Sequence, residues 1–458
     1  MSLRWVFRGG VSAPHRKNTF ESETSVINIP EKVIIPMVQH IGAPCTPLVK
    51  QGDTVKVGQK IGDSEAYVSV PIHSSVSGTV TRVEPMLYAS GKLVMSVEIK
   101  TDGNQEIYEG ISAPEVKNKD DFLKAVRNSG LVGLGGAGFP THVKLNPPKD
   151  KEIDCLIING AECEPYITSD YREMVENPSR VIKGVKLVLD YLNIPKAIIG
   201  IEDNKPKAIR MLADLAKSDK RISVQRLRSI YPQGAEKTLI YTVTGRKIPS
   251  GKLPADVGCI VLNVNTVSFI ASYIENGMPL IQRRVTVDGP VVSQPKNVLV
   301  PIGTSLQDLF DFCGGFKSTP YKVLMGGPMM GIAQYSLETS VIKNTNAILA
   351  FDKKEGDLPA EWACIRCGKC VEACPMNLMP LEINRLVMAN KTGELEKYHI
   401  LDCIECGSCS YSCPSKRHLV QSIRIGKDAV RRVKVNRNLG ENIGKQQIVC
   451  MFISAFKR

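Results

Sequence analysis

Two short cysteine runs near the end of the chain restrict its fold and chemistry more than any other feature. The first run holds Cys364, Cys367, Cys370 and Cys374, and the second holds Cys403, Cys406, Cys409 and Cys413. A proline follows the last cysteine of each run, so both read C-x2-C-x2-C-x3-C-P. This spacing is typical of cubane [4Fe–4S] clusters, because thiolates two residues apart in a tight loop can all face one cluster.

The fourth cysteine of such a run usually binds the other cluster. We therefore expect one cluster on Cys364, Cys367, Cys370 and Cys413, and a second on Cys403, Cys406, Cys409 and Cys374. Structural zinc fits poorly because zinc sites use pairs of ligands rather than runs of four. Disulfides would need an oxidising compartment, which nothing in the sequence indicates. Two clusters held in this way form an electron wire.

Length and charge set further limits. The 458 residues favour roughly three domains. No apolar run approaches the ~18 residues of a membrane span, and the N-terminus up to Thr19 lacks the apolar core of a signal peptide, which predicts a cytoplasmic chain. Much of the formal charge of +13 follows the clusters, since residues 415–458 hold eleven Lys or Arg against two acids. This excess fits a solvated helix face, or a surface for acidic partners or anionic lipids. No recognition motif indicates nucleic acid.

Residues 1–110 have the pattern of a small β domain. Short alternating strands are separated by Gly-Asp and Ser-Gly turns, as in residues 70–80, and this favours a β-sandwich. The pattern resembles the barrel-sandwich fold of biotinyl and lipoyl carrier domains, which place a modified lysine on a hairpin tip. Here Ile72, His73 and Ser74 occupy that region without a lysine. We therefore expect a structural or docking domain, with His73 in a surface turn.

Residues 111–270 alternate between strand and helix patterns. Predicted strands cover residues 154–159, 196–201, 222–227 and 259–264, and predicted helices cover residues 120–129, 178–192, 205–216 and 235–244. Alternation of this kind argues for a mainly parallel, Rossmann-like α/β domain. Ligands of such domains bind at the carboxyl ends of the strands.

Three segments of this domain suggest a ligand site. Residues 130–144 form a glycine-rich loop, which suits phosphate because glycines allow close approach and present N–H donors, although a plain tight turn has the same composition. Residues 159–165 place Glu162 and Glu164 at the end of a buried strand, and residues 231–237 open a helix after another strand. Each segment alone is compatible with ordinary turn chemistry, but three together favour a binding site.

These segments carry a resemblance to a known family. Residues 133–141 with Lys144 are similar to the flavin-binding loop of the NADH-oxidising flavoprotein subunit of respiratory complex I. Residues 159–165, 231–236 and 261–266 are similar to three further segments of that subunit. With the N-terminal sandwich and the two cysteine runs added, the whole chain resembles the C subunit of the Rnf electron-transport complexes.

The resemblance implies FMN and NAD(H) on the α/β domain and electron flow between NAD and ferredoxin, coupled to Na⁺ or H⁺ translocation by membrane partners. It implies a peripheral subunit of a ferredoxin:NAD oxidoreductase, at the cytoplasmic face of the cell membrane. Its partners would be the membrane and peripheral subunits of the same complex, with ferredoxin reached indirectly. The flavin would take a two-electron hydride and release single electrons to the clusters.

The resemblance also implies roles for individual residues. FMN phosphate and ring would be held by Gly133, Gly135, Gly136, Gly138 and Lys144, with Asn159 and Asn263 in the same site. Phe139 would stack on the NADH adenine. The flavin–nicotinamide pocket would be formed by Glu162, Glu164, Tyr231 and Glu236.

Four departures from the family pattern remove polar groups from this pocket. They are Ala161 for Asp, Ala235 for Glu, Leu262 for Asn and Asn265 for Glu. Two alternatives therefore stay open beside the enzyme subunit. One is a non-catalytic iron–sulfur wire whose flavin pocket has decayed. The other is a soluble diaphorase subunit of a bifurcating enzyme, although the relatives there carry one cluster ending rather than two such runs.

The remaining regions carry weaker signals. Residues 271–350 resemble the β-grasp domain that follows the flavin domain in the complex I relative. Residues 326–331 are compatible with a ligand or partner surface, but they favour a tight turn with core methionines at 329 and 330. The 28 residues between the cysteine runs predict a helical ferredoxin-like module over residues 351–435. Residues 436–458 form a tail that fits a partner subunit, a membrane interface or disorder equally well.

Overall fold

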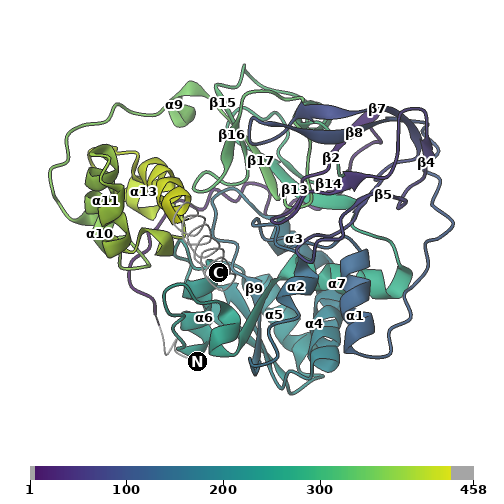
Figure 1. The fold of residues 1–458 in the computed structure, drawn as a ribbon, viewed down its shortest axis with the longest axis horizontal. Coiled ribbons are helices and arrows are strands. Elements are labelled where there is room, and N and C mark those ends of the chain that lie inside the picture. Colours follow the sequence, from purple (N-terminus) through teal and green to yellow (C-terminus); the bar gives the residue numbers. More distant parts are fainter. Residues whose placement is uncertain (1–5, 435–458) are drawn as a thin grey trace, which may run out of the picture. The chain divides into compact units, whose positions relative to one another are not determined.

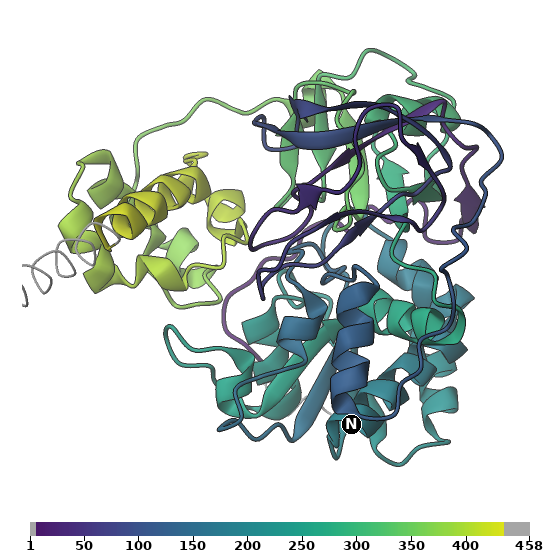
Figure 2. The same cartoon turned by 45° about the vertical axis from the view of Figure 1, so that its right-hand side comes forward.

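The computed structural model describes residues 6–434, so the expectations for residues 436–458 lie outside it. The chain divides into two compact units (Figure 1, Figure 2). The large unit holds residues 12–248 and 252–358, and the small unit holds residues 7–11, 249–251 and 359–434. Within residues 6–434, no helix has the length and apolar character needed to cross a membrane.

The first part of the large unit consists of two small antiparallel sheets, with the strand orders β2–β8–β7–β4 and β3–β5–β6. The strands are β2 (Lys32–Pro36), β3 (Thr46–Pro47), β4 (Thr54–Val55), β5 (Lys60–Asp63), β6 (Ile72–His73), β7 (Gly78–Leu87) and β8 (Leu93–Thr101). Alternate residues such as Val33, Ile35 and Val97 are fully buried in one core. This arrangement agrees with the sandwich predicted from the sequence.

His73 lies in strand β6, so the prediction of a surface turn is wrong at this residue. The strand pairs with β5, and only 6% of His73 is exposed. Burial, together with the nearby Lys343, lowers the pKa of His73 to about 3, and the imidazole is therefore neutral. A two-residue strand between turns has no periodicity of its own, so the sequence pattern could not reveal it.

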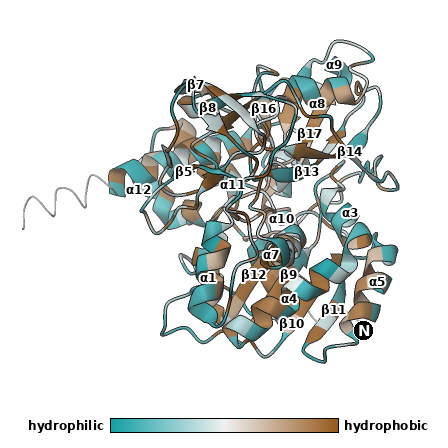
Figure 3. Ribbon diagram, turned by 90° about the vertical axis from the view of Figure 1, so that its right-hand side faces the viewer, coloured by the Kyte–Doolittle hydropathy of each residue, from teal (hydrophilic) through white to brown (hydrophobic). Residues whose placement is uncertain are grey.

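The second part of the large unit is a parallel sheet with the order β11–β10–β9–β12. Its strands are β9 (Cys155–Gly160), β10 (Ala197–Glu202), β11 (Ile222–Leu227) and β12 (Cys259–Asn263). The helices of this part are α1 (Lys119–Asn128), α2 (Thr141–Lys144), α3 (Ser169–Glu176), α4 (Pro178–Leu192), α5 (Pro206–Ala216), α6 (Glu236–Thr244) and α7 (Val264–Asn276). The central strands are apolar on both faces because helices cover both (Figure 3). The predicted alternation of strands and helices is confirmed, but α2, α3 and α7 were not predicted.

The third part of the large unit is a six-stranded mixed sheet with the order β1–β14–β13–β17–β15–β16. Its strands are β1 (Thr24–Val26), β13 (Gln282–Asp288), β14 (Lys296–Pro301), β15 (Lys322–Met325), β16 (Ile332–Gln334) and β17 (Ala347–Phe351). Helix α8 (Leu306–Phe312) buries Leu306, Leu309 and Phe310 in the core of this part, and α9 (Lys353–Gly356) follows the last strand. Strand β1 pairs in parallel with β14. A segment from the N-terminus therefore completes a sheet built from much later residues.

The small unit is helical, in agreement with the prediction for the module that carries the cysteine runs. Its helices are α10 (Lys369–Glu372), α11 (Pro380–Met388), α12 (Thr392–Leu395) and α13 (Ser408–Ser412), and residues 419–434 are also helical. Ile383, Ile400 and Ile423 are fully buried in its core, beside several of the cysteines. The N-terminal segment joins this unit through Gly10, whose N–H donates to the carbonyl oxygen of Ala373 at 3.0 Å.

Candidate functional site

Donors from other parts of the chain hold the glycine-rich loop between α1 and α2 by hydrogen bonds to its carbonyl oxygens. Arg283 donates from Nη2 to the oxygen of Leu134 at 3.2 Å, and Asn344 donates from Nδ2 to that of Gly136 at 2.7 Å. The backbone N–H of Ile41 donates to the oxygen of Gly138 at 3.1 Å. Every second carbonyl of this stretch is thus bound by a group outside the loop.

The N–H groups of the same loop have no comparable partners. Within the described chain, none of the N–H groups of residues 135–139 donates a well-formed hydrogen bond to a protein acceptor. Gly136 has a φ of +121°, and a Cβ added there would meet no atom within 4 Å. A row of free N–H groups beside open space is a suitable site for an anion such as the phosphate of FMN.

The carboxyl ends of two neighbouring strands meet this loop. Asn159 is the last residue but one of β9 and Asn263 ends β12, and the two are register partners in the parallel sheet. Asn263 caps helix α7 by accepting from the N–H of Asn265 at 2.9 Å. A Cβ added at Gly135 would lie 3.3 Å from the Asn263 side chain, so a larger residue would press on this strand end.

The two asparagines have different partners. Asn159 donates to the carbonyl oxygen of Gly234 at 2.8 Å and so ties the end of β9 to the segment before α6. Asn263 donates to the carboxylate of Asp170 at 2.7 Å, and Asn265 donates to its other oxygen at 2.6 Å. Burial raises the pKa of Asp170, and the hydrogen bonds from the two asparagine amides oppose that effect.

Lys144 and Glu236 come together although they lie far apart in the sequence. The Lys144 ammonium is 2.6 Å from the Glu236 carboxylate, and about a third of each side chain is exposed (31% and 37%). Lys144 ends the short helix α2, whereas Glu236 begins α6. An exposed ion pair of this kind contributes little to stability, so both groups are available to a ligand.

Glu162 is a buried carboxyl within the loop that follows β9. It accepts from the N–H of Asp170 at 2.7 Å, and Lys17 lies 4.0 Å away. Burial raises the pKa of Glu162 to about 7, against the opposing charge of Lys17. The Lys17 ammonium also donates to the carbonyl oxygens of Glu162, Glu164 and Ile167 at 2.8, 2.9 and 2.5 Å, and so fixes the path of this loop.

Glu164 is the second buried carboxyl of the loop. One oxygen accepts from the N–H of Met329 at 3.0 Å, and the other has no hydrogen-bond partner in the described chain. Burial raises the pKa of Glu164 to about 7. Residues 326–331 therefore do more than form a turn, and the expectation of core methionines is wrong for Met330, which is 46% exposed. Two carboxyls that titrate near neutral pH can hold or release a proton during a reaction.

The other residues expected in the site lie around this loop. Tyr231 is buried and shares the lining of a small pocket with Lys17, Glu162 and Cys163. Phe139 is half-buried, and its carbonyl oxygen closes the base of the glycine loop by accepting from Gly133 at 2.8 Å. Sequence reasoning missed Lys17, Asp170, Arg283 and Asn344, because each acts on a segment distant from its own in the chain.

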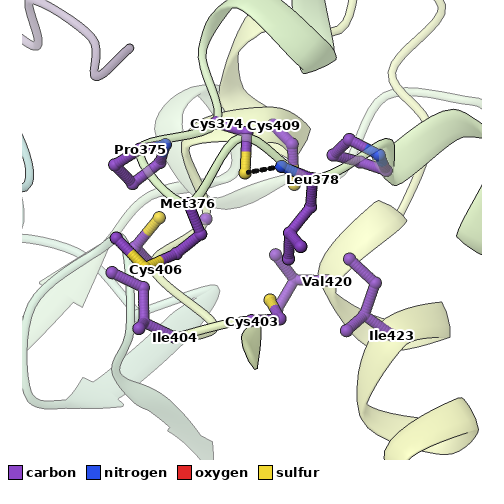
Figure 4. Close-up of a pocket in the computed structure, with 12 residues that line it drawn as sticks. Cys374, Pro375, Met376, Leu378, Cys403, Ile404, Cys406, Cys409, Val420 and Ile423 are labelled. Atoms are coloured by element: carbon purple, nitrogen blue, oxygen red, sulfur yellow. Dashed lines mark hydrogen bonds between the residues drawn. The ribbon is translucent and has the colours of Figure 1, made fainter. Parts of the chain in front are cut away.

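Four cysteines from both runs line one pocket in the small unit (Figure 4). They are Cys374, Cys403, Cys406 and Cys409, the set expected for the second cluster. The N–H of Leu378 donates to the sulfur of Cys374 at 3.4 Å, and that of Glu405 donates to the sulfur of Cys403 at 3.3 Å. Hydrogen bonds of this type stabilise cluster thiolates, so the pocket fits a [4Fe–4S] cluster.

The environment of this pocket also suits a negatively charged cluster. The ammonium of buried Lys427 donates to the carbonyl oxygen of Cys403 at 2.9 Å and pairs with Glu405 at 2.5 Å. Apolar groups such as Val420 and Ile423 complete the lining. Within residues 6–434, no group of three or more His, Cys, Asp or Glu side chains is arranged to hold a single metal ion.

The cysteines expected for the first cluster have a more open setting. Cys364 and Cys367 are exposed, whereas Cys370 is buried. Cys413 and Cys364 lie close enough to Cys370 for their charges to act on its thiol. Trp362 precedes this run and Ile365 lies within it, and they are 71% and 68% exposed. The two cluster sites therefore differ in their access to solvent.

Comparison with protein families gives four matches along the chain. Residues 5–104 match the RnfC barrel sandwich hybrid domain, and residues 126–272 match the Nuo51 FMN-binding domain. Residues 284–333 match the SLBB domain, and residues 363–417 match the 4Fe-4S dicluster domain. The glycine loop, both strand ends and the two carboxyls lie within the FMN-binding match, so the cradle of free N–H groups belongs to a flavin-binding domain.

Similarity to complete proteins extends over nearly the whole chain. The chain is 48% identical to the C subunit of the Na⁺-translocating ferredoxin:NAD⁺ oxidoreductase complex of Acetobacterium woodii, over 92% of this chain and 96% of that protein. It is also 48% identical to the C subunit of the proton-translocating ferredoxin:NAD⁺ oxidoreductase complex of Clostridium ljungdahlii, over 91% and 92%. With the C subunit of an ion-translocating oxidoreductase complex of Klebsiella pneumoniae it shares 39% identity over 83% of this chain and 51% of that protein. The chain therefore belongs to the RnfC family, which supplies the C subunit of the ion-translocating ferredoxin:NAD⁺ oxidoreductase (Rnf) complexes.

Proposed function

We propose that this chain is the NAD(H)-reacting, cluster-bearing subunit of a membrane-associated, ion-translocating ferredoxin:NAD oxidoreductase. It exchanges hydride between NAD(H) and FMN in the large unit and passes single electrons through two [4Fe–4S] clusters in the small unit. The observation that carries this proposal is the row of free N–H groups at residues 135–139, in the same domain as two buried carboxyls with raised pKa values. FMN, when bound, supplies the conversion between a hydride and single electrons.

The proposal assigns the loop to the flavin phosphate. The glycines at 133, 135, 136 and 138 give the backbone its close approach, and Lys144 adds a positive charge at the edge of the site. Asn159 and Asn263 close the floor at the strand ends. These assignments rest on the free donors and on the match of this region to FMN-binding domains.

The carboxyls are assigned to proton balance and to the nicotinamide side of the pocket. Hydride transfer between NAD(H) and a flavin changes the number of protons bound, and Glu162 and Glu164 change protonation near pH 7. Tyr231 lies beside Glu162 in the same small pocket, and Glu236 is paired with Lys144. We assign Phe139 to the adenine end of NAD(H), because Phe139 stands at the end of the glycine loop and is itself only half-buried.

For the clusters, we propose that the fourth cysteine of each run binds the cluster of the other run. Cys374 comes from the first run, yet it lines the pocket with the first three cysteines of the second run. The complementary set is Cys364, Cys367, Cys370 and Cys413. Two clusters within electron-transfer reach of each other would act as a wire.

The fold assignments that accompany this function are a Rossmann-like flavin domain over residues 111–270 and a β-grasp domain over residues 271–350. The parallel sheet β11–β10–β9–β12 supports the first, and the mixed sheet with helix α8 supports the second. A barrel-sandwich domain over residues 1–110 and a cluster module over residues 351–435 complete the proposed division. We place the subunit at the cytoplasmic face of the membrane, on the other subunits of its complex, with ferredoxin as an indirect partner.

The second candidate is a non-catalytic iron–sulfur subunit without flavin. It is suggested by the four pocket positions at which this chain lacks the polar residue of the family pattern. Two features oppose it. Asn265, one of the departures, retains a polar role through its hydrogen bond to Asp170, and the glycine loop keeps its free donors. The relatives oppose the soluble diaphorase. They are subunits of ion-translocating complexes, and this chain matches them over nearly their full length.

Flavin and iron content of the anaerobically purified chain, followed by NADH addition, would test the proposal. We expect about eight irons and bound FMN whose visible absorption bleaches on NADH addition. Eight irons without flavin, and no NADH response after FMN is supplied, would identify the chain as a wire. Co-sedimentation with membranes from the native host separates the Rnf subunit from a soluble diaphorase.

A further inference from the structure

The donors that hold the glycine loop follow a simple rule. In a trans peptide the C=O and the following N–H point in opposite directions. A donor on the oxygen of Leu134 therefore directs the N–H of Gly135 the other way. The donors on Gly136 and Gly138 act in the same manner on the N–H groups of Ala137 and Phe139. Three external hydrogen bonds thus set the direction of three of the five free N–H groups.

These donors lie outside the parallel sheet β11–β10–β9–β12. Arg283 belongs to β13, Asn344 precedes β17, and Ile41 belongs to the barrel sandwich. The middle peptide, between Gly136 and Ala137, depends on Asn344 alone. It is also the peptide with most freedom, because Gly136 has open space around its Cα and glycine accepts many backbone conformations.

Asn344 is well placed to act on this peptide. It is half-buried, and a Cβ added at Gly138 would lie 3.2 Å from its Nδ2, so the amide sits tightly under the loop. The preceding residue fixes its backbone. The buried ammonium of Lys343 donates to the carbonyl oxygens of Gly130 at 2.7 Å and Pro71 at 2.6 Å, and the N–H of Lys343 donates to the side chain of Gln39 at 3.1 Å.

We propose that Asn344 is a positioning residue of the flavin site, which orients the Gly136–Ala137 peptide so that the N–H of Ala137 faces the phosphate. This inference rests on the proposed assignment of the glycine loop to FMN. Without the amide donor, the peptide can rotate and present its carbonyl oxygen to the phosphate, which repels it. Asn344 itself does not touch the phosphate and acts only through the loop.

The test compares three variants of the full chain, with FMN affinity measured by fluorescence titration of the flavin-free protein. Asn344→Asp keeps the shape of the side chain but replaces the donor with an acceptor, and Asn344→Ala removes both. Asn346→Ala is the matched control, because Asn346 is equally half-buried, lies two residues away and makes no side-chain hydrogen bond in the described chain. We expect the Kd for FMN to rise about tenfold or more in both Asn344 variants and to stay unchanged in the control.

Hydrogen exchange of the peptide that covers residues 133–139 gives a second readout in the absence of flavin. The two bonded amides of this peptide, those of Gly133 and Leu134, should exchange faster in both Asn344 variants, while iron content stays at its original value. Unchanged FMN affinity in Asn344→Asp and Asn344→Ala would overturn the inference. If Lys144→Ala weakens FMN binding while the Asn344 variants do not, the flavin assignment stands and only this inference fails. If none of these variants alters FMN binding, the flavin assignment of the loop fails as well.

Discussion

The proposed flavin site and the proposed cluster pocket are assembled in opposite ways. All ligands of the cluster pocket lie between residues 374 and 409, and the loops that carry them are short. The proposed flavin site draws on distant parts of the sequence, since Lys17 holds the loop after β9 and Asn344 holds the glycine loop. A site built from residues close in the sequence can be recognised from the spacing of those residues. In a site built from distant segments, only the most regular loop can be recognised from the sequence.

The largest loss of activity is expected at a cysteine of one run that binds the cluster of the other run. Cys374→Ser should destroy the second cluster, which the other three cysteines of that set cannot hold in its normal form, and electron transfer from NADH to the native membrane partners should be lost. Iron should fall by about half, with the surviving signal in electron paramagnetic resonance coming from the first cluster. Flavin content should not change, because the flavin site lies in the large unit.

Cys413→Ser serves as the matched partner of that variant, since it occupies the same place in the other run. It should damage the first cluster and leave the second intact. Loss of the first cluster in Cys374→Ser would show that each run holds its own cluster, and the crossed pairing would then be wrong.

A smaller effect is expected at the edge of the flavin site. Lys144→Ala and Glu236→Gln should each lower NADH-dependent dye reduction by roughly tenfold to a hundredfold, because both remove a charge beside the ligand. Stability should change little, since the pair is a third exposed. Steady-state kinetics with an artificial acceptor, with iron content as the internal control, would check this. Wild-type rates in both variants would contradict the assigned pocket.

The smallest effect concerns stability and pH at Glu164. Its pKa rises from 4.5 to about 7 on folding, so the folded protein binds a proton more tightly than the unfolded chain. The stability that this group contributes is complete below about pH 4.5 and is lost as the pH rises through 7. The shift corresponds to about 3 kcal/mol at most. Glu164→Gln should therefore unfold at higher denaturant concentration than the wild type at pH 8, with little difference at pH 5.

Denaturant unfolding at the two pH values measures this change, and Glu338→Gln, an exposed carboxyl, is the control. Equal stabilities of Glu164→Gln and the wild type at pH 8 would mean that the carboxyl is not desolvated as its burial indicates.

Much of the α/β fold could be predicted because its elements carry regular patterns. Helix α4 and strand β11 begin and end at the predicted residues. Pro178 marks the start of the helix, and a turn lies on each side of the strand. Helix α7 was missed because it begins directly at the end of β12. Asn263 serves both as the last residue of the strand and as the helix cap, so the apolar pattern runs on without a break.

The candidate site could be predicted only in part, for a physical reason. The glycine loop and the two carboxyls stand out in the sequence because their residue types are unusual. Nothing in the sequence near Asn344 or Arg283 reveals that their side chains bind a loop more than a hundred residues away. The prediction for Met330 failed for the same reason, because the backbone of residues 326–331 faces Glu164 from another part of the unit.

The N-terminal segment has a consequence for the order in which the protein assembles. Lys17 binds carbonyl groups of residues 162–167, and strand β1 pairs with β14. These contacts have very large sequence separations, and such contacts form slowly. During synthesis residues 17–26 leave the ribosome well before residues 296–301 of β14, so β1 can dock only late. The N-terminal segment thus completes its contacts only after β14 has been made, although the partners of Lys17 in the acidic loop are made much earlier.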